Sequence, residues 1–384
     1  MDVMKNIICF WMLCIVFFGC KRNIDSISEN AKVVYSPLKD IPLVDDLAPF
    51  MDTVLYLVPE LILPAPVCKM LIDDCGNMYM LGFKGDLVTL TSTGKKFRDF
   101  TTQGRAQNEY IKINDIALRG QPKELLVLDE NKVMEFGVDD TLAFRTFNTP
   151  LGVPYDAIAP SGKEHCWLFA AFPVDSRNLD KHKDYLLKLV DQDGEILKEI
   201  LRREDCTFSM MNITQSSNNV YYLKPQNARH IFYRLEQDSI VPYYKIDFGD
   251  RNIPPRYFFD DANNDITKYM RAPYFKQVCF AHETYRHFYF KCAGEDAIEY
   301  NFLLDKNNPQ HGICWINKDQ SSDIYIICAD EKYFYVLLNK YQIEQFYGNK
   351  EKEANPLYRY IVNSLGDKLD FANSDEVIIK IAFK

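Results

Sequence analysis

The sequence lacks the basic clusters that mark many nucleic-acid-binding proteins. Its 45 Lys and Arg residues are outnumbered by 54 Asp and Glu residues, so the net charge is −9, and no dense basic stripe occurs. A nucleic-acid backbone is bound through clustered cations that displace its counterions. Nucleic acid is therefore not an expected partner.

Short motifs of catalysis and cofactor binding are also missing. With only 16 glycines, the chain contains neither G-x-x-x-x-G-K-[ST] nor G-x-G-x-x-G, the loops that bind phosphate groups. The G-x-S-x-G turn of serine hydrolases is absent as well. His282-Glu283 is followed by His287, one position too far for the zinc motif H-E-x-x-H. We predict no cofactor, no metal and no catalytic residue, and expect both histidines at the surface beside a turn.

The first residues have the features of a bacterial lipoprotein signal. Lys5 precedes an apolar run over residues 7–18, which is too short to span a bilayer comfortably. Gly19 and Cys20 follow, as in a lipobox, although Phe17 and Phe18 are bulkier than usual. We predict a signal peptide over 1–19, a lipid on Cys20 and a tether over 20–50. A cleaved signal peptide, or an uncleaved anchor with an incidental cysteine, is the alternative.

Export would place the protein in the cell envelope, held to a membrane by the lipid, with the outer membrane favoured over the inner. The side of the membrane stays open. Export also permits disulfides. Cys279 and Cys292 flank the polar turn HETYRH and would face each other across a hairpin centred between Tyr285 and Arg286. They form a disulfide or remain two buried thiols. No C-x-x-C pair is present, and a zinc site is not expected.

A repeated unit is the most informative feature that is present. An apolar strand end, a polar turn with Asp or Gly, and a second strand recur six times, with starts 46 to 67 residues apart. Such turns supply tight hairpin geometry, and the flanking apolar residues alternate with period two. No amphipathic helix of three turns is evident. The copies begin at Leu90, Phe136, Leu189, Leu235, Phe302 and Ile361.

Most copies are preceded by another pair of short strands, so each unit holds about four strands, like a propeller blade. We predict an all-β fold over 51–384, a six-bladed β-propeller of four-stranded antiparallel blades. Residues 55–65 and 376–384 are both strand-like, and one chain end should complete the last blade, because a closed ring leaves no open sheet edge. A β-sandwich with irregular hairpins is the alternative.

Several stretches resemble a known family. Phe97-Arg98-Asp99-Phe100 leads to Gly104 and Glu109-Tyr110, Ile246-Asp247-Phe248-Gly249 precedes Ile253-Pro254, and the chain ends in an apolar strand. Together they resemble exported six-bladed propeller proteins of Bacteroidetes, often lipoproteins, which are related in shape to NHL-type propellers. Ala106, Gln107 and Asn108 replace the family's Gly-Pro-Gly. The resemblance covers almost all of the mature chain and implies carbohydrate-related roles only by context.

In a propeller, loops from several blades converge at one mouth of the central channel, and ligands bind there. Residues 103–110 and 254–264 should contribute, with Arg105, Glu109 and Tyr110 as candidate ligand contacts. The favoured function is a binding or scaffold module for a glycan or an envelope protein. An enzyme acting on polysaccharide, a lyase or hydrolase with residues converging at the mouth, is the alternative. A structural subunit with an apolar flank is a third hypothesis.

Overall fold

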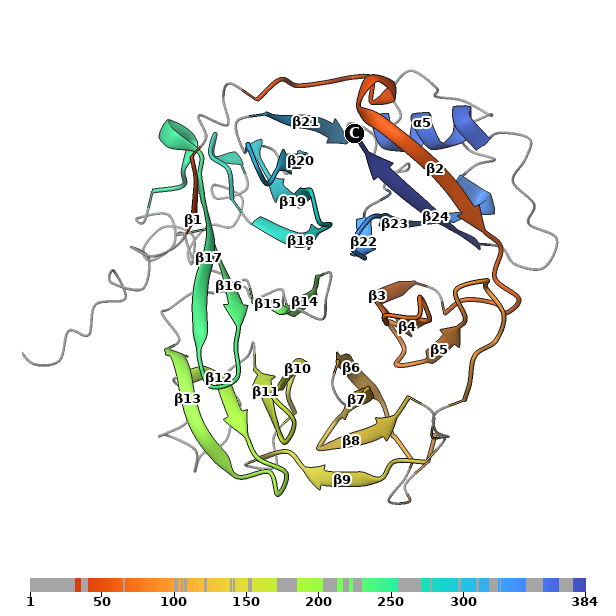
Figure 1. The fold of residues 1–384 in the computed structure, drawn as a ribbon. Coiled ribbons are helices and arrows are strands. Elements are labelled where there is room, and N and C mark those ends of the chain that lie inside the picture. The colour runs from red at the N-terminus through yellow and green to blue at the C-terminus, as the bar shows by residue number, and fades with distance from the viewer. Residues whose placement is uncertain are drawn as a thin grey trace, which may run out of the picture.

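Six β-sheets surround a common centre, so the predicted six-bladed propeller is confirmed (Figure 1). Three- to five-stranded sheets follow one another around the ring in chain order. The computed structural model describes residues 32–35, 41–64, 66–99, 103–104, 106, 109–120, 123–138, 140, 142–150, 154–170, 185–202, 213–216, 221–223, 230–254, 271–276, 278–295, 298–308, 311–317, 324, 326–342, 355–365 and 376–384.

We number the blades in chain order, from the innermost strand outward. Blade 1 contains β3 (Val67–Ile72), β4 (Met78–Gly82) and β5 (Leu87–Leu90). Blade 2 contains β6 (Ile113–Arg119), β7 (Glu124–Asp129), β8 (Lys132–Gly137) and β9 (Arg145–Asn148). Blade 3 contains β10 (Ala157–Ser161), β11 (His165–Phe169), β12 (Tyr185–Val190) and β13 (Ile196–Arg202). Blade 4 contains β14 (Ile213–Gln215), β15 (Tyr221–Leu223), β16 (Ile231–Leu235) and β17 (Ile240–Asp247), and β1 (Lys32–Tyr35) extends it at the outer edge. Blade 5 contains β18 (Val278–Glu283), β19 (His287–Ala293), β20 (Glu299–Asp305) and β21 (Gly312–Asn317). Blade 6 contains β22 (Ile326–Ala329), β23 (Phe334–Asn339), β24 (Glu376–Phe383) and β2 (Met51–Leu57).

Burial decreases from the inner strands to the outer ones. All six residues of β7 are buried, whereas Phe147 alone is buried in the outer strand β9. Blades stack face to face, so their inner strands are covered on both sides and read as continuous apolar runs. The outer strands keep one side toward water.

Recurrent Asp–Gly turns close the hairpins, as the sequence predicts. In the β12–β13 turn, Asp191 Oδ1 accepts hydrogen bonds from the Asp193 and Glu195 N–H groups at 3.0 and 2.9 Å. Gly194 has φ +83°, which is strained for residues with a Cβ. Asp73 and Gly76 repeat this arrangement between β3 and β4. The Asp side chain thus replaces missing backbone partners, and the glycine provides the left-handed bend.

The ring is closed by pairing the two ends of the propeller sequence. β2 lies antiparallel to β24 in blade 6, from Met51 opposite Phe383 to Leu57 opposite Ile378. The Lys384 N–H also donates to the Phe50 carbonyl at 2.9 Å. The predicted completion of the last blade by the other end of the chain is confirmed. β24 becomes a central strand with no open edge.

Residues 32–35 and 41–57, which we call the N-terminal strap, follow the outer edges of three consecutive blades (Figure 1). β1 pairs in parallel with β17 of blade 4. The Val44 N–H donates to the Cys314 carbonyl of blade 5, and the Cys314 N–H donates to the Pro42 carbonyl. β2 then completes blade 6. Residues 32–35 and 42–44, which lie within the predicted tether 20–50, therefore pair through their backbone with the outer strands of blades 4 and 5.

The predicted strand-turn-strand at Ile361 is wrong. The helix α5 (Pro356–Leu365) occupies this position between β23 and β24. Its buried residues, including Leu357, Ile361 and Leu365, have helical spacing, and Asn355 Oδ1 accepts from the Leu357 N–H at 2.9 Å. No strand is needed here because β2 already fills the outer place of blade 6. Two 3-10 turns, η2 (Ala48–Phe50) and η5 (Gly249–Arg251), complete the described elements used below.

The predicted signal peptide and Cys20 lie outside the described residues. Within the described part of the chain, no helix has the length and apolar character needed to cross a bilayer.

Candidate functional site

Glu109 and Tyr110, two of the three predicted ligand contacts, make hydrogen bonds within their own loop. The Gly104 N–H donates to the Tyr110 carbonyl at 2.9 Å, and Glu109 Oε2 accepts from the Ala106 N–H at 2.9 Å. A Cβ on Gly104 would meet the Glu109 carboxylate, which would have to shift. Burial, and then Asp86, raises the pKa of Tyr110, whose ring is half-buried. Arg105 lies outside the described residues. The role of Arg105, Glu109 and Tyr110 as ligand contacts stays a prediction.

Around the centre, polar groups on the inner strands bond to one another. The Lys69 ammonium of β3 lies 2.7 and 2.9 Å from the two carboxylate oxygens of Asp115 on β6. Asp115 Oδ2 also accepts from the Ile158 N–H of β10 at 2.9 Å. Burial raises the pKa of Asp115, and Lys69 and the Ile158 N–H oppose that shift. One carboxylate thereby joins blades 1, 2 and 3.

Tyr221 makes a second contact between separate blades. Its hydroxyl, from β15 of blade 4, donates to the Leu118 carbonyl and accepts from the Leu118 N–H of blade 2, at 2.8 and 2.6 Å. The side chain is buried, and burial raises its pKa well above the usual range. Like Asp115, Tyr221 therefore serves the packing of the inner strands.

A buried charge cluster in blade 2 also proves to be structural. Arg119 bonds to Glu124 and lies 3.4 Å from Glu135, while Arg145 bonds to the other Glu135 oxygen at 3.0 Å. Burial raises the pKa of Glu135, against the effect of the two guanidinium groups. Two cations and two carboxylates balance each other, so the cluster retains no charge for a ligand.

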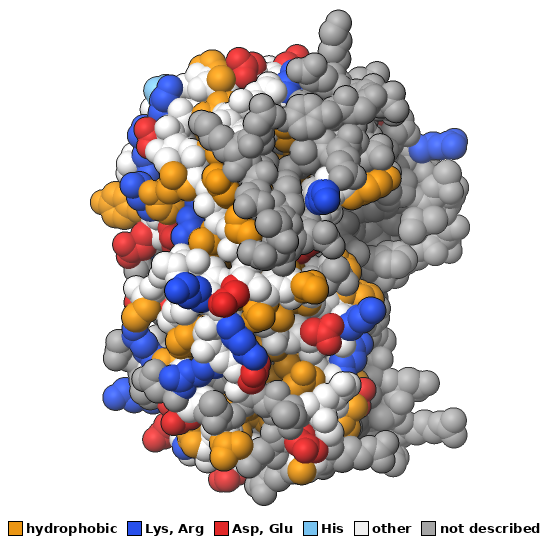
Figure 2. All heavy atoms as spheres, turned by 90° about the vertical axis from the view of Figure 1, so that its right-hand side faces the viewer, with side chains coloured by type: hydrophobic (Ala, Val, Ile, Leu, Met, Phe, Trp, Pro, Cys, Tyr) orange, Lys and Arg blue, Asp and Glu red, His pale blue; other side chains and the backbone are white. Residues whose placement is uncertain are grey.

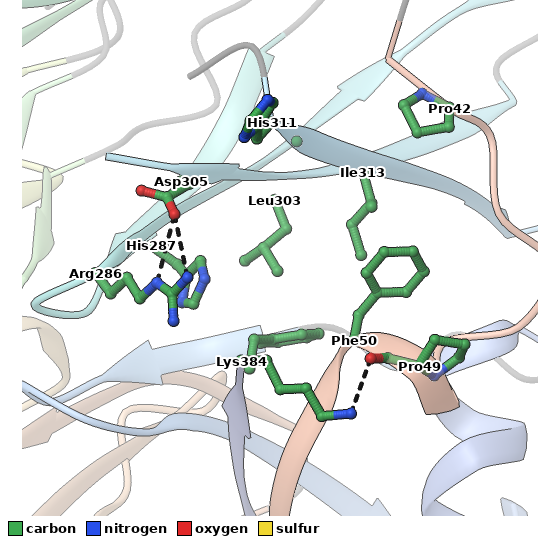
Figure 3. A pocket seen from close by; sticks show the side chains of 12 residues that line it. Pro42, Pro49, Phe50, Arg286, His287, Leu303, Asp305, His311, Ile313 and Lys384 are labelled. Carbon is green, nitrogen blue, oxygen red and sulfur yellow. Dashed lines mark hydrogen bonds and ion pairs between the residues drawn. The ribbon is translucent and has the colours of Figure 1, made fainter. Parts of the chain in front are cut away.

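One concave site formed by described residues lies between blades 5 and 6. A pocket of about 320 Å³ is formed by the turn after β18, the turn between β20 and β21, the strap and the end of β24 (Figure 3). Its described lining residues are Pro42, Pro49, Phe50, Arg286, His287, Leu303, Asp305, His311, Gly312, Ile313, Phe383 and Lys384.

This pocket opens on the face opposite the one expected from the sequence. In an antiparallel blade, the turns after the first and third strands share one face, and the links between blades share the other. Arg286 lies in the turn after the first strand of blade 5, and Asp305 lies at the start of the turn after its third strand, so the pocket is on the first of these faces. Residues 103–110 link blades and so belong to the second face. Almost all of 254–264 lies outside the described residues.

Charged groups surround an apolar middle in this pocket (Figure 3). The Arg286 Nε and Nη2 atoms both lie 3.4 Å from Asp305 Oδ2. Asp305 Oδ1 accepts from the Asn307 N–H at 2.8 Å. Burial alone would raise the pKa of Asp305, but these hydrogen bonds and Arg286 hold it below its usual value. Lys384 Nζ donates to the Pro49 carbonyl at 3.0 Å.

The two histidines of the HETYRH segment are not surface residues. His282 is 4% exposed and His287 is 7% exposed. Burial lowers the pKa of His282 to about 3, and burial followed by Arg286 lowers the pKa of His287. The expectation of surface positions is wrong because blade 6 packs over the end of this hairpin. Both rings are neutral at pH 7, and only His287 lines the pocket.

The hairpin itself differs from the prediction by one residue. Glu283 pairs with Phe288, as the predicted turn centre requires, but a bulge between Cys279 and His282 shifts the register. Cys279 is opposite Lys291, and Cys292 is opposite Val278. Direct opposition of the two cysteines is therefore wrong. The Cys279 side chain lies outside the described residues, so the disulfide stays a prediction.

Two further observations concern the alternative functions. Asp305 is the one Asp or Glu among the described lining residues, whereas glycoside hydrolysis uses a pair of such side chains. No group of three or more His, Cys, Asp or Glu residues suited to a metal occurs in the described part of the chain. On the described part of the flank seen in Figure 2, apolar side chains are interspersed with charged ones.

Comparisons with known proteins give one family and several similar structures, and the family and the first structure agree with the fold. The family DUF5128, described as a six-bladed β-propeller, matches residues 84–334. A structure described as "Putative exported protein" from Bacteroides fragilis is similar at a TM-score of 0.67 and 14% identity, covering 86% of this chain and 95% of its own. AztD from Citrobacter koseri is similar at a TM-score of 0.38 and 11% identity, covering 71% and 69%. No curated protein matches.

Proposed function

Because this chain belongs to the DUF5128 family of six-bladed β-propellers, we propose that it is an exported binding module whose ligand site is the pocket between blades 5 and 6. The observation that supports this most is the composition of the pocket. Phe50, Leu303 and Ile313 provide apolar surface, and Arg286 and Lys384 provide charge at its sides. Small ligand sites combine apolar walls with a few placed polar groups in this way.

The N-terminal residues support a proposal for its location. The lipobox at Gly19-Cys20 and the description of the similar Bacteroides fragilis protein as exported both support export. We propose that a lipid on Cys20 holds the module at a membrane of the cell envelope, with the outer membrane favoured. We also propose that the chain is related in shape to NHL-type propellers. The ligand of a module in the cell envelope would be a protein or a glycan of the envelope.

Blocking the pocket should weaken ligand binding. His311 is exposed at its rim, so His311→Trp should cover the pocket without disturbing the core. Short peptides and oligosaccharides would be screened by the shift of the thermal midpoint, because a ligand of the native state stabilises it. We expect a ligand whose affinity falls roughly tenfold or more in this variant, about 1.4 kcal/mol.

Asp193→Trp is the matched control, since Asp193 is exposed in the corresponding turn of blade 3. It should bind like the wild type. Ligands that bind both variants equally well would place the site elsewhere and contradict the assignment of the pocket.

Loss of the lipid should release the protein from the membrane. Cys20→Ala removes the predicted attachment site, whereas Cys14→Ala changes a cysteine of the predicted signal peptide, which is cleaved away. Fractionation of cells should find the Cys20→Ala protein mostly soluble and the Cys14→Ala protein mostly in the membrane. Equal membrane retention of the two variants would refute lipid anchoring at Cys20.

A further inference from the structure

Tyr285 is the most exposed large apolar side chain in the described part of the chain. It is 83% exposed and lies in the turn between β18 and β19, directly before the pocket residue Arg286. An aromatic ring in water forgoes the free energy that burial of its apolar surface would supply. Tyr is also enriched where proteins contact one another, because its ring is apolar and its hydroxyl is polar. Tyr285 therefore has the character of a contact residue beside the pocket.

The turn that carries Tyr285 is held by hydrogen bonds with neighbouring turns. The Tyr285 N–H donates to the Glu331 carbonyl of blade 6 at 2.7 Å. The Lys306 N–H donates to the Arg286 carbonyl at 2.8 Å, and Lys306 Nζ donates to the Thr284 carbonyl at 3.0 Å. These bonds hold the backbone on both sides of the ring. A fixed backbone lowers the entropy cost of binding through the exposed side chain.

The pocket suits an uncharged side chain, because its charges are offset within the molecule. Arg286 Nε and Nη2 both lie 3.4 Å from Asp305 Oδ2. Lys384 brings its ammonium, which donates to the Pro49 carbonyl at 3.0 Å, and also the α-carboxylate of the last residue. A volume of about 320 Å³ is near the lower end for ligand pockets and suits one large side chain. The apolar middle that an aromatic ring would cover consists of Phe50, Leu303 and Ile313 (Figure 3).

The exposed ring and the pocket complement each other in a two-fold arrangement. Because Tyr285 adjoins the pocket, a two-fold axis between them brings the Tyr285 of each copy to the pocket of the other. The whole chain carries a net charge of −9, so two copies repel each other in general. Residues 284–286, 305–311 and 330–333, which form the turns beside the pocket, contain three Lys or Arg and three Asp or Glu. This part of the surface therefore has no excess of either sign to oppose the contact.

We infer that two copies of this chain associate through a two-fold contact in which Tyr285 of each copy occupies the pocket of the other. The inference rests on the proposed function, since both use the same pocket, and a ligand of the pocket would displace Tyr285 and separate the copies. The contact is centred on two side chains and is small. We expect a dissociation constant on the order of micromolar or weaker, as for small interfaces.

Sedimentation equilibrium over a range of concentrations tests the contact. The starting protein is the Cys20→Ala chain, which lacks the predicted lipid site. Tyr285→Ser should weaken its association about a hundredfold, about tenfold for each of the two contacts. Tyr341→Ser is the matched control, since Tyr341 is 66% exposed and follows the second strand of blade 6, on the opposite face. It should associate like the starting protein.

A mixture of two variants tests the exchange of Tyr285 itself. His311→Trp blocks the pocket but keeps Tyr285, whereas Tyr285→Ser keeps an open pocket. Each variant alone loses both contacts, and the mixture regains one of them. We expect the two variants to associate with each other about tenfold more tightly than either does with itself.

The outcomes separate the two proposals. An association that is absent in the starting protein, unchanged by Tyr285→Ser or not regained in the mixture would overturn the two-fold contact. If the copies do not associate but a ligand is lost in His311→Trp, the pocket assignment stands and only the contact between copies is wrong. If no ligand depends on His311, the proposed function itself fails.

Discussion

A chain that lacks residues 1–57 is expected to lose its cooperative fold. Removing β2 exposes the edge of β24, breaks its ladder of backbone bonds and uncovers the core around Met51. Each hydrogen bond contributes roughly 0.5–1.5 kcal/mol. Together with the lost apolar burial, the cost is comparable with the whole stability of a typical domain, about 5–15 kcal/mol. Thermal unfolding followed by circular dichroism would then show no sharp transition.

A chain that lacks only residues 1–40 is the control. It loses the edge strand β1 but keeps β2 and the Pro42–Cys314 contact. We expect a cooperative transition with a modestly lower midpoint. A peptide of residues 49–58, added to the shorter chain, should restore part of the transition. If the chain without residues 1–57 unfolded as sharply as the control, closure by β2 would not hold the ring together.

Replacing Asp115 by Ala is expected to be strongly destabilising. It leaves the Lys69 ammonium unpaired at the inner strands and removes the acceptor of the Ile158 N–H. Breaking a buried ion pair from one side costs about 3–5 kcal/mol. The free energy of unfolding in urea measures this loss. Because the carboxylate joins blades 1, 2 and 3, the loss should affect the whole transition.

The matched control is Asp99→Ala. Lys96 and Asp99 also lie 2.7 Å apart, but their side chains are 46% and 75% exposed. An exposed pair of this kind contributes about 0–1 kcal/mol. Replacing both Lys69 and Asp115 by apolar residues should recover part of the stability, since no buried charge is left alone. If Asp115→Ala lowered the free energy of unfolding no more than Asp99→Ala does, burial would add nothing to the Lys69–Asp115 ion pair.

Function was less predictable than fold, and the pocket shows why. Its lining comes from the strap, from two turns of blade 5 and from the last residues of β24. Arg286, Asp305 and Lys384 are ordinary turn and chain-end residues in the sequence, with no motif to join them. The one signal near them is the charged turn HETYRH, whose histidines the sequence predicts at the surface. Glu109 and Tyr110, the predicted ligand contacts, lie in a loop that links blades.

The sequence by itself determined the six blades, the positions of most strands, the Asp–Gly turns and closure by the two ends. Those features depend on period-two apolar residues and turn chemistry, which act over a few neighbours. The tertiary structure alone decided the bulge that separates Cys279 from Cys292, the helix at Ile361, the path of the strap and the pocket. Each of these depends on contacts between segments far apart in the chain, which no local pattern records.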